Sequence, residues 1–312
     1  MGVARHSTQA TSVKNLSDNV LTLSSGCVVV DRSASVVPAT LTAPTSPSNR
    51  VLRLVLGVET TQKTGNHRLS KKALSHTLLF RLSLSLSRHQ AGVPNLHELD
   101  LRSNSLTALP DELAELRTLK SVKLNYNKLE TIPEVLTKLP RLTNLELGGN
   151  ALTVVGEMVS RLPVIKELDL SGNQISTVHA SIAGQETLTY LNFENNMLVT
   201  LPPEMGTMVN LQRLDLSNNQ LTELPATFGG LKGLTKMEVN NNKLGSLPAS
   251  MGHLKQLKEL DCRYNLFVEP GKSKSEGPIT GFLEFLREEE KRLKQEEIER
   301  LKPIPTMVGP YC

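Results

Sequence analysis

Tryptophan is absent from this chain of 312 residues, and aromatic residues make up only 3% of it. A hydrophobic core must therefore be built from aliphatic side chains. Cysteine is equally scarce: Cys27, Cys262 and Cys312 lie far apart, in a spacing that fits neither a disulfide framework nor a metal site. This usage is typical of a reducing compartment, and we expect a cytoplasmic location.

Long apolar runs are also missing. No segment reaches the roughly 18 consecutive apolar residues of a membrane-spanning helix, and the N-terminus lacks the apolar run of a secretory signal. The Gly-Lys-Ser at 271–273 is no phosphate-binding loop, because Leu266 stands where the first glycine is required. No paired catalytic carboxylates or metal-ligand spacing can be recognised. We expect no membrane span, no cofactor, no metal ion and no catalytic activity.

The charge is distributed unevenly along the chain. Residues 1–90 contain 11 Lys/Arg and 3 Asp/Glu, whereas residues 91–270 contain 16 and 20. The first segment, called the basic arm below, is rich in Ser and Thr and is predicted to be disordered. Its basic residues lack interleaved aromatics, so no nucleic-acid partner is expected. Within it, the alternating segment 79–87 is a candidate strand that would cover the exposed edge of the following domain.

An internal repeat occupies residues 91–270. An aliphatic residue recurs every 23 residues, at Leu96, Leu119, Leu142, Ile165, Leu188, Leu211, Leu234 and Leu257. Asparagine recurs in step, at Asn104, Asn127, Asn150, Asn173, Asn196, Asn219, Asn242 and Asn265. Eight units in phase without an insertion predict a stacked solenoid.

The spacing within a unit has a physical reason. Leu214 and Leu216 alternate with polar residues, which predicts a short strand with one buried face. Asn219 follows where the chain bends and backbone groups lose their strand partners; its amide can both donate to and accept from them. One unit cannot stabilise itself, because fixing 23 residues costs more free energy than its few buried leucines supply. Stacking is therefore required.

The unit L-x-x-L-x-L-x-x-N-x-L-x-x-L-P-x-x-x-x-x-L-x-x resembles the leucine-rich repeat. The Leu-Pro or Ile-Pro step, at Pro110, Pro133, Pro202, Pro225 and Pro248, resembles more narrowly the intracellular Ras-group type of the Ras-suppressor proteins, Scribble, Erbin and the plant Ras-group proteins. The resemblance covers about residues 93–301. It implies a right-handed α/β solenoid, a horseshoe with a parallel sheet on its concave face. It also implies a non-catalytic scaffold in intracellular signalling, with a Ras-like GTPase or its effector as one partner.

Two units depart from this pattern. Gly156 and His179 replace the proline of repeats three and four, and Gln185 takes a position that is leucine in most units. Either the convex side has drifted in sequence, or the middle of the solenoid is locally loosened or serves as a convex docking site.

The C-terminal segment 271–303 resembles the closing segment of Ras-group repeats. Gly277-Pro278 is a plausible helix start, and Ile279, Phe282, Leu283 and Leu286 follow at helical spacing as a stripe that would cover the last repeat. Beyond it the helix becomes charged. Leu293, Ile298 and Leu301 make a short seam for a coiled coil, so we expect a monomer. Residues 304–312 form a tail.

The binding face is predicted from the strands. One residue between the core leucines of each strand points outward, and these residues are Asp100, Lys123, Glu146, Asp169, Asn192, Asp215, Glu238 and Asp261. Flanking positions add Glu98, Glu167, Glu194 and Glu259, partly offset by Arg102, Arg213, Lys236 and Arg263. Tyr126, Tyr190 and Tyr264 project to this face or its rim. Because like charges on neighbouring strands repel, the excess of acids predicts a protein partner with a basic surface.

Two alternatives remain open. In the first, Leu-Asp-Leu is simply a common sequence at this position of the repeat, and the acidic face is exposed to solvent without binding a partner. In the second, the protein is a regulatory or targeting subunit of an enzyme complex, such as a phosphatase or a ubiquitin ligase.

Overall fold

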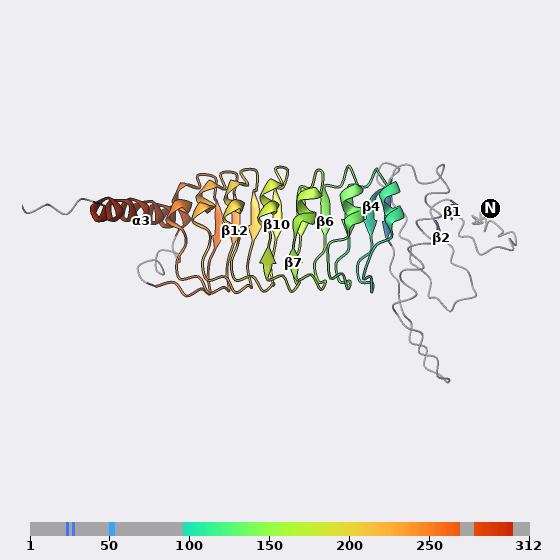
Figure 1. Ribbon diagram of the computed structural model, residues 1–312, viewed down its shortest axis with the longest axis horizontal. Helices are drawn as coiled ribbons and strands as arrows, with labels where there is room; N and C mark the ends of the chain where they lie inside the picture. Colours follow the sequence, from blue (N-terminus) through green and yellow to red (C-terminus); the bar gives the residue numbers. More distant parts are fainter. Residues whose placement is uncertain (1–22, 25–26, 29–49, 54–95, 269–277, 302–312) are drawn as a thin grey trace, which may run out of the picture.

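The computed structural model describes residues 23–24, 27–28, 50–53, 96–268 and 278–301 (Figure 1). The candidate strand 79–87, most of the basic arm and the tail 304–312 lie outside the described residues. Inside the arm, β1 (Leu23–Ser24) and β2 (Cys27–Val28) pair antiparallel. β3 (Arg50–Arg53) pairs parallel with the first strand of the repeats, so the described strand at that edge comes from residues 50–53.

The repeats contribute one strand each to a parallel sheet. These strands are β4 (Leu96–Asp100), β5 (Ser121–Lys123), β6 (Asn144–Glu146), β8 (Glu167–Asp169), β10 (Tyr190–Asn192), β11 (Arg213–Asp215), β12 (Lys236–Glu238) and β13 (Glu259–Asp261). With β3 they form a nine-stranded sheet in chain order. From β4 to β13 each residue pairs with the one 23 positions later, as Leu191 does with Leu214. Equivalent side chains therefore line up across the sheet.

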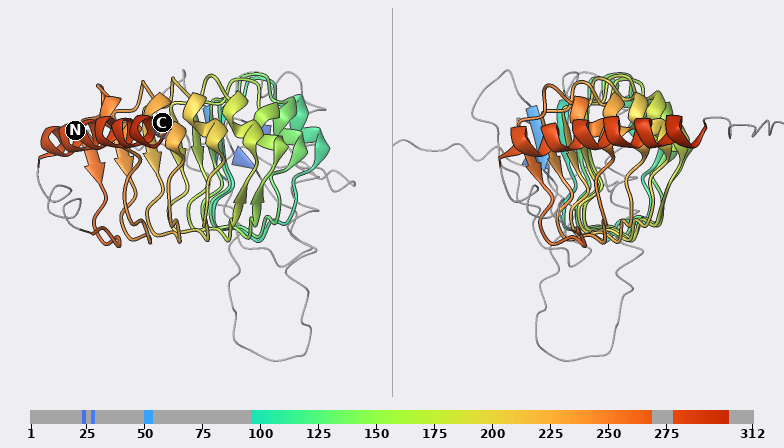
Figure 2. Two further views of the ribbon diagram at one scale, coloured as in Figure 1. Left: turned by 60° about the vertical axis from the view of Figure 1, so that its left-hand side comes forward. Right: turned by 90° about the vertical axis from the view of Figure 1, so that its left-hand side faces the viewer.

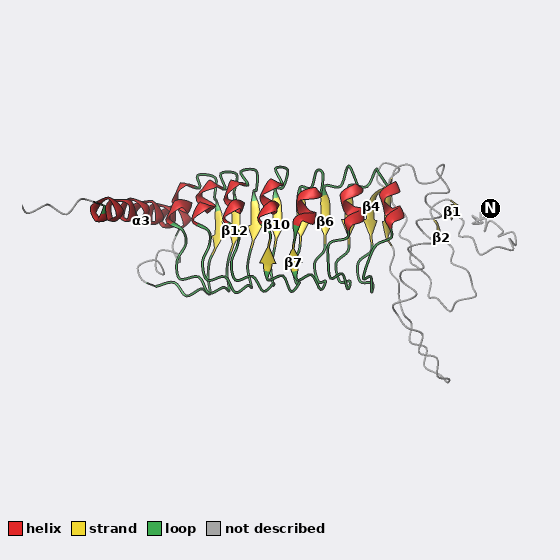
Figure 3. Ribbon diagram, viewed as in Figure 1, coloured by secondary structure: helices red, strands yellow, loops and turns green. Residues whose placement is uncertain are grey.

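Short 3-10 helices form the opposite layer (Figure 3). They are η1 (Asp111–Glu115), η2 (Glu134–Lys138), η3 (Glu157–Arg161), η4 (Ala180–Gly184), η5 (Pro203–Thr207), η6 (Ala226–Gly230) and η7 (Ala249–His253). One continuous core of leucine, isoleucine, valine, methionine and phenylalanine fills the space between the layers. Cys262 replaces a core leucine in the last repeat and is 4% exposed. The predicted α/β solenoid with its parallel sheet is confirmed.

From Asn127 to Asn265, each repeat asparagine connects two neighbouring repeats. In Asn219, Oδ1 accepts a hydrogen bond from the Leu198 amide (3.0 Å), while Nδ2 donates to the carbonyls of Phe193 (2.9 Å) and Leu216 (3.1 Å). The same three bonds recur from Asn127 to Asn265. The side chain thus satisfies backbone groups that a turn removes from the sheet.

The two repeats without proline gain a structural element. β7 (Val154–Val155) and β9 (Thr177–Val178) form a small parallel sheet (Figure 1). The His179 amide donates to the Val155 carbonyl at 2.8 Å, and a proline would have no N–H to donate. Of the alternatives given above, local loosening does not hold at this position, where the change adds a hydrogen bond. Gln185 is buried, and its Nε2 donates to the carbonyls of Val159 and Leu162.

A 22-residue helix, α3 (Ile279–Arg300), closes the C-terminal end of the solenoid (Figures 1 and 2). Phe282, Leu283 and Leu286 are buried against the last repeat, as the stripe predicts. The helix lies directly on Gly252, where a Cβ would stand 2.8 Å from the Arg287 backbone nitrogen. Gly206 and Gly229 occupy the equivalent positions of the two preceding repeats and contact the next 3-10 helix in the same way.

The second half of α3 extends beyond the body of the solenoid (Figure 1). Residues 291–300 are all exposed, and ion pairs three or four residues apart, such as Arg292 with Glu289 and Glu296, run along this half. Leu293 and Ile298 are 50% and 56% exposed. Such pairs support a helix that packs against little else.

Candidate protein-binding surface

The eight outward residues predicted from the strands form one row across the sheet. Strand pairing aligns Asp100, Lys123, Glu146, Asp169, Asn192, Asp215, Glu238 and Asp261. We call this row the central column. Neighbouring members stand on strands about 4.8 Å apart, so the repeat register determines which charges meet.

Aspartate is frequent in the central column for a local reason. The Oδ1 atom of Asp169 accepts a hydrogen bond from the Ser171 amide (3.0 Å), and Asp215 accepts one from Ser217 (2.9 Å). Asn192 makes the same bond through its amide oxygen, at 2.8 Å to the Glu194 amide. A short side chain with an oxygen thus caps the end of the strand. The frequency of aspartate alone is therefore no sign of a partner.

At both ends of the sheet, an arginine two residues on engages the central-column aspartate. Arg102 forms two side-chain hydrogen bonds with Asp100, at 3.0 and 2.9 Å, and Arg263 does the same with Asp261, at 2.9 and 2.7 Å. The Arg263 guanidinium lowers the pKa of the Asp261 carboxyl below its usual value. These forked pairs neutralise the two ends of the column.

Three further cations form ion pairs with acids of the face. They are Lys123 with Glu98 (2.7 Å) and Glu146 (3.9 Å), Lys236 with Glu238 (3.4 Å) and Glu259 (3.6 Å), and Arg213 with Glu167 (3.8 Å). The sequence placed these cations beside the column. Their pairing, however, depends on how far each side chain reaches across strands.

Three acids of the face form no ion pair with a Lys or Arg of the part of the chain that the structure describes. They are Asp169, Glu194 and Asp215, on or beside β8, β10 and β11, and we call them the acidic centre. Burial raises the pKa of the Glu194 carboxyl above its usual value, and the carboxylates of Asp215, Glu238 and Asp169 raise it further. In the sequence, Glu194 is one of four flanking acids and nothing distinguishes it from the others. The structure distinguishes it, because the other three flanking acids form ion pairs with a lysine or arginine.

The three predicted tyrosines differ in what covers them. The Arg213 guanidinium lies over the Tyr190 ring, 4.5 Å from its centroid, so one face of this ring is already occupied. Tyr126 and Tyr264 stand three positions beyond their strands and are 69% and 77% exposed. A hollow of about 120 Å³ opens beside Tyr190, between Arg213, Asp215, Lys236 and Glu238.

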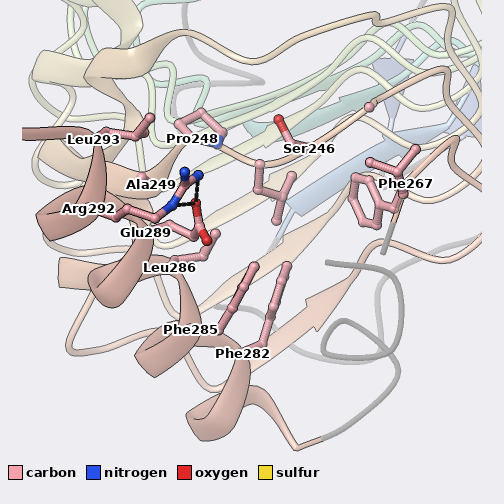
Figure 4. A pocket seen from close by; sticks show the side chains of 13 residues that line it. Ser246, Pro248, Ala249, Phe267, Phe282, Phe285, Leu286, Glu289, Arg292 and Leu293 are labelled. Atoms are coloured by element: carbon pink, nitrogen blue, oxygen red, sulfur yellow. Dashed lines mark hydrogen bonds and ion pairs between the residues drawn. The ribbon is translucent and has the colours of Figure 1, made fainter. Parts of the chain in front are cut away.

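A larger cavity lies at the C-terminal end, away from the central column (Figure 4). It measures about 420 Å³ and lies between the last repeat and α3. Phe267, Phe282, Phe285 and Leu293 line it, and Glu289 and Arg292 form an ion pair at its side. Within the described ranges, no three His, Cys, Asp or Glu side chains gather as a metal site, and no helix is long and apolar enough to cross a bilayer.

Two protein families match the repeats. Residues 94–152 match the family described as leucine rich repeat, and residues 151–269 match the leucine-rich repeat region family. Together they span the eight units that the spacing predicted. The matches are to leucine-rich repeats in general and do not separate the Ras-group type from the others.

Solved structures share the fold. A leucine-rich-repeat protein of Leptospira interrogans is 30% identical with a TM-score of 0.50, over 62% of this chain and 53% of that one. Internalin C2 of Listeria monocytogenes is 26% identical with a TM-score of 0.51, over 60% and 77%. The ectodomain of the Arabidopsis thaliana receptor kinase GASSHO1/SCHENGEN3, in complex with Casparian strip integrity factor 2, is 30% identical with a TM-score of 0.50, over 59% and 22%.

A curated relative covers much less. Dynein regulatory complex subunit 7 of Chlamydomonas reinhardtii is 57% identical over 49 residues, which are 16% of this chain. The match spans 4% of that protein's length.

Proposed function

Because this chain is a leucine-rich-repeat protein, we propose that it binds another protein on the concave face of its sheet, and that the acidic centre receives basic side chains of that partner. Leucine-rich-repeat solenoids are interaction modules, and the structurally similar plant ectodomain is itself in complex with a second factor. The fold provides the binding face, and the acidic centre marks the part of that face that we expect a partner to contact.

The pattern of ion pairs is the observation that supports this proposal. Elsewhere on the face, acids meet an arginine or lysine of the same chain, as Asp100 and Asp261 do. Burial raises the pKa of the Glu194 carboxyl, and the nearby carboxylates of Asp215 and Asp169 raise it further. The acidic centre thus retains a repulsion between like charges that a partner's cations would relieve. Electrostatic complementarity of this kind increases the rate of association and makes it sensitive to salt.

The Ras-group resemblance makes a Ras-like GTPase or its effector the first partner to test. The curated relative belongs, by its name, to a dynein regulatory complex, so subunits of a comparable assembly are the second. A regulatory or targeting subunit of an enzyme complex would use the same face. Co-purification of an enzyme in stoichiometric amount would distinguish this role from that of a signalling scaffold.

The test neutralises the acidic centre without disturbing the strands. The triple variant Asp169→Asn, Glu194→Gln and Asp215→Asn keeps the side-chain oxygens that cap the strands, as Asn192 shows in the native chain. Its stability should stay within about 0.5 kcal/mol of the parent. Full-length parent and variant are compared as baits at low and high salt, and each captured protein is then titrated against both.

We expect binding to weaken by about tenfold or more, with a shallower salt dependence, because three charges no longer attract the partner. A matched control removes three exposed acids of the 3-10 layer, by Glu115→Gln, Glu134→Gln and Glu204→Gln, and should bind like the parent. Equal affinity of the folded triple variant and the control would contradict the proposal and move the site to the 3-10 layer or to α3.

A further inference from the structure

The chain itself contains one arginine held between a tyrosine and a carboxylate. Arg213 lies 4.5 Å above the Tyr190 ring, and its Nη2 reaches Glu167 at 3.8 Å, two strands away. A planar guanidinium can make both contacts at once, because its face stacks on the ring while its edge faces the acid. This arrangement shows that a tyrosine and an acid on this face can together bind a guanidinium group.

Tyr126 and Asp169 offer the same two groups with the ring face open. A Cβ at Gly149 would stand 2.6 Å from Tyr126 Cδ1, so the tyrosine ring occupies the space that the missing side chain leaves. A Cβ at the preceding Gly148 would stand 3.3 Å from Asp169 Oδ2. Ring and carboxylate therefore both lie against the Gly148–Gly149 step. Among the described residues, no arginine or lysine stacks on Tyr126, and 69% of the residue is exposed.

The fold does not explain a tyrosine at position 126. Its φ is +59°, in the left-handed region that disfavours bulky residues. Five equivalent positions hold asparagine or glycine, which tolerate this conformation, namely Asn195, Asn218, Asn241, Gly149 and Gly172; the first and last repeats hold Ser103 and Tyr264. Tyr126 buries little surface in return. Packing against Gly149 covers only part of the side chain, and the exposed remainder is available to a partner.

We propose that an arginine of the partner stacks on the Tyr126 ring and pairs with Asp169. This inference rests on the proposed function and names the side chain that the N-terminal edge of the acidic centre recognises. Arginine is favoured over lysine because only a guanidinium combines stacking with a forked pair to a carboxylate. The partner's segment crosses the strands from repeat two towards repeat six, with its other cations near Glu194 and Asp215.

The decisive variant is Tyr126→Asn, which removes the ring and installs the residue found at this position in repeats five to seven. Asparagine relieves the backbone strain, so the variant should melt no lower than the parent. Tyr264→Asn is the matched control: Tyr264 has a φ of +56° and is 77% exposed, but the adjacent Asp261 is already paired with Arg263. Tyr126→Phe retains the ring and should retain binding.

The probes are two fluorescent peptides of equal length and charge, one with arginines and one with lysines between glycines. On the parent protein the arginine peptide should bind about fivefold more tightly than the lysine peptide. Tyr126→Asn should abolish that preference, and Tyr264→Asn should leave it intact. Equal affinity of the two peptides for the parent, or an unchanged preference in Tyr126→Asn, would overturn the inference.

The two proposals fail in different ways. If the triple variant of the acidic centre binds both peptides as the parent does, the proposed function itself is wrong. If the triple variant loses both peptides while Tyr126→Asn changes neither affinity, the face binds cations without selecting arginine.

Discussion

Replacing Asn219 with alanine removes a side chain that bonds to the backbone of two neighbouring repeats in the middle of the solenoid. The residue is 8% exposed. Its Nδ2 donates to the carbonyls of Phe193 and Leu216, but each of these keeps another donor, Asn196 for Phe193 (3.0 Å) and Asn242 for Leu216 (2.9 Å). The Leu198 amide differs, because the Oδ1 of Asn219 is its acceptor, at 3.0 Å.

The size of the effect follows from that difference. The substitution leaves one buried N–H without a partner, which costs about 1–3 kcal/mol. The carbonyls lose one of two donors and add little. For a repeat domain of this size, about 2 kcal/mol corresponds to a fall in melting temperature of roughly 4–8 °C.

Two measurements check this reasoning. Thermal unfolding followed by circular dichroism gives the change in melting temperature. Hydrogen exchange with mass spectrometry should show faster exchange at Leu198, one repeat before the substituted residue, because its amide has lost its acceptor. Protection at the Phe193 and Leu216 turns should change less.

The control is Asn210→Ala, an exposed asparagine whose Nδ2 donates to the Glu186 carbonyl at 2.8 Å. We expect it to change stability by about 0.5 kcal/mol or less. If Asn219→Ala has the same melting temperature as Asn210→Ala, or if the Leu198 amide keeps its protection from hydrogen exchange, then the repeat asparagines do not stabilise the solenoid as described.

Two further substitutions test the convex side. His179→Pro restores the proline of the other repeats at a compatible φ of −76°, yet it should destabilise the protein by about 1 kcal/mol by deleting the hydrogen bond to Val155; a rise in melting temperature, with His179→Ala as reference, would contradict this. Gly252→Val should detach α3, because the new Cβ meets the Arg287 backbone nitrogen at 2.8 Å and the Leu283 carbonyl oxygen at 2.9 Å. Limited proteolysis should then cut within 278–301, whereas Gly184→Val, with nothing within 4 Å, should leave the helix protected.

The repeat itself could be predicted from the sequence because every unit solves the same problem. A period of 23 residues places Leu191, Leu214 and their equivalents in identical surroundings, and β10 and β11 pair in that register. The stripe from Phe282 to Leu286 predicted the closing helix for the same kind of reason, since helical spacing puts these residues on one buried face. The local sequence pattern was sufficient to predict the structure wherever a residue packs against the equivalent residue of the next repeat.

Departures from the repeat were harder to interpret. Gly156 and His179 were visible as missing prolines, but the sequence suggested drift or loosening. The bond from the His179 amide to Val155 is a contact between two repeats, and a single unit contains no sign of it. Gly252 is equally plain in the sequence, and only the approach of the α3 backbone gives it a role.

Only the tertiary structure decided which charges of the concave face remain unpaired. The sequence placed acids and bases in columns, but an ion pair depends on which strand a long side chain crosses. Arg213 passes over Tyr190 to Glu167, while Lys123 turns to Glu98 and Glu146, so the three acids of the acidic centre form no ion pair with a Lys or Arg of the described residues. Those choices join residues 23 to 46 positions apart. They follow from reach and competition in three dimensions, which the order of residues along the chain does not determine.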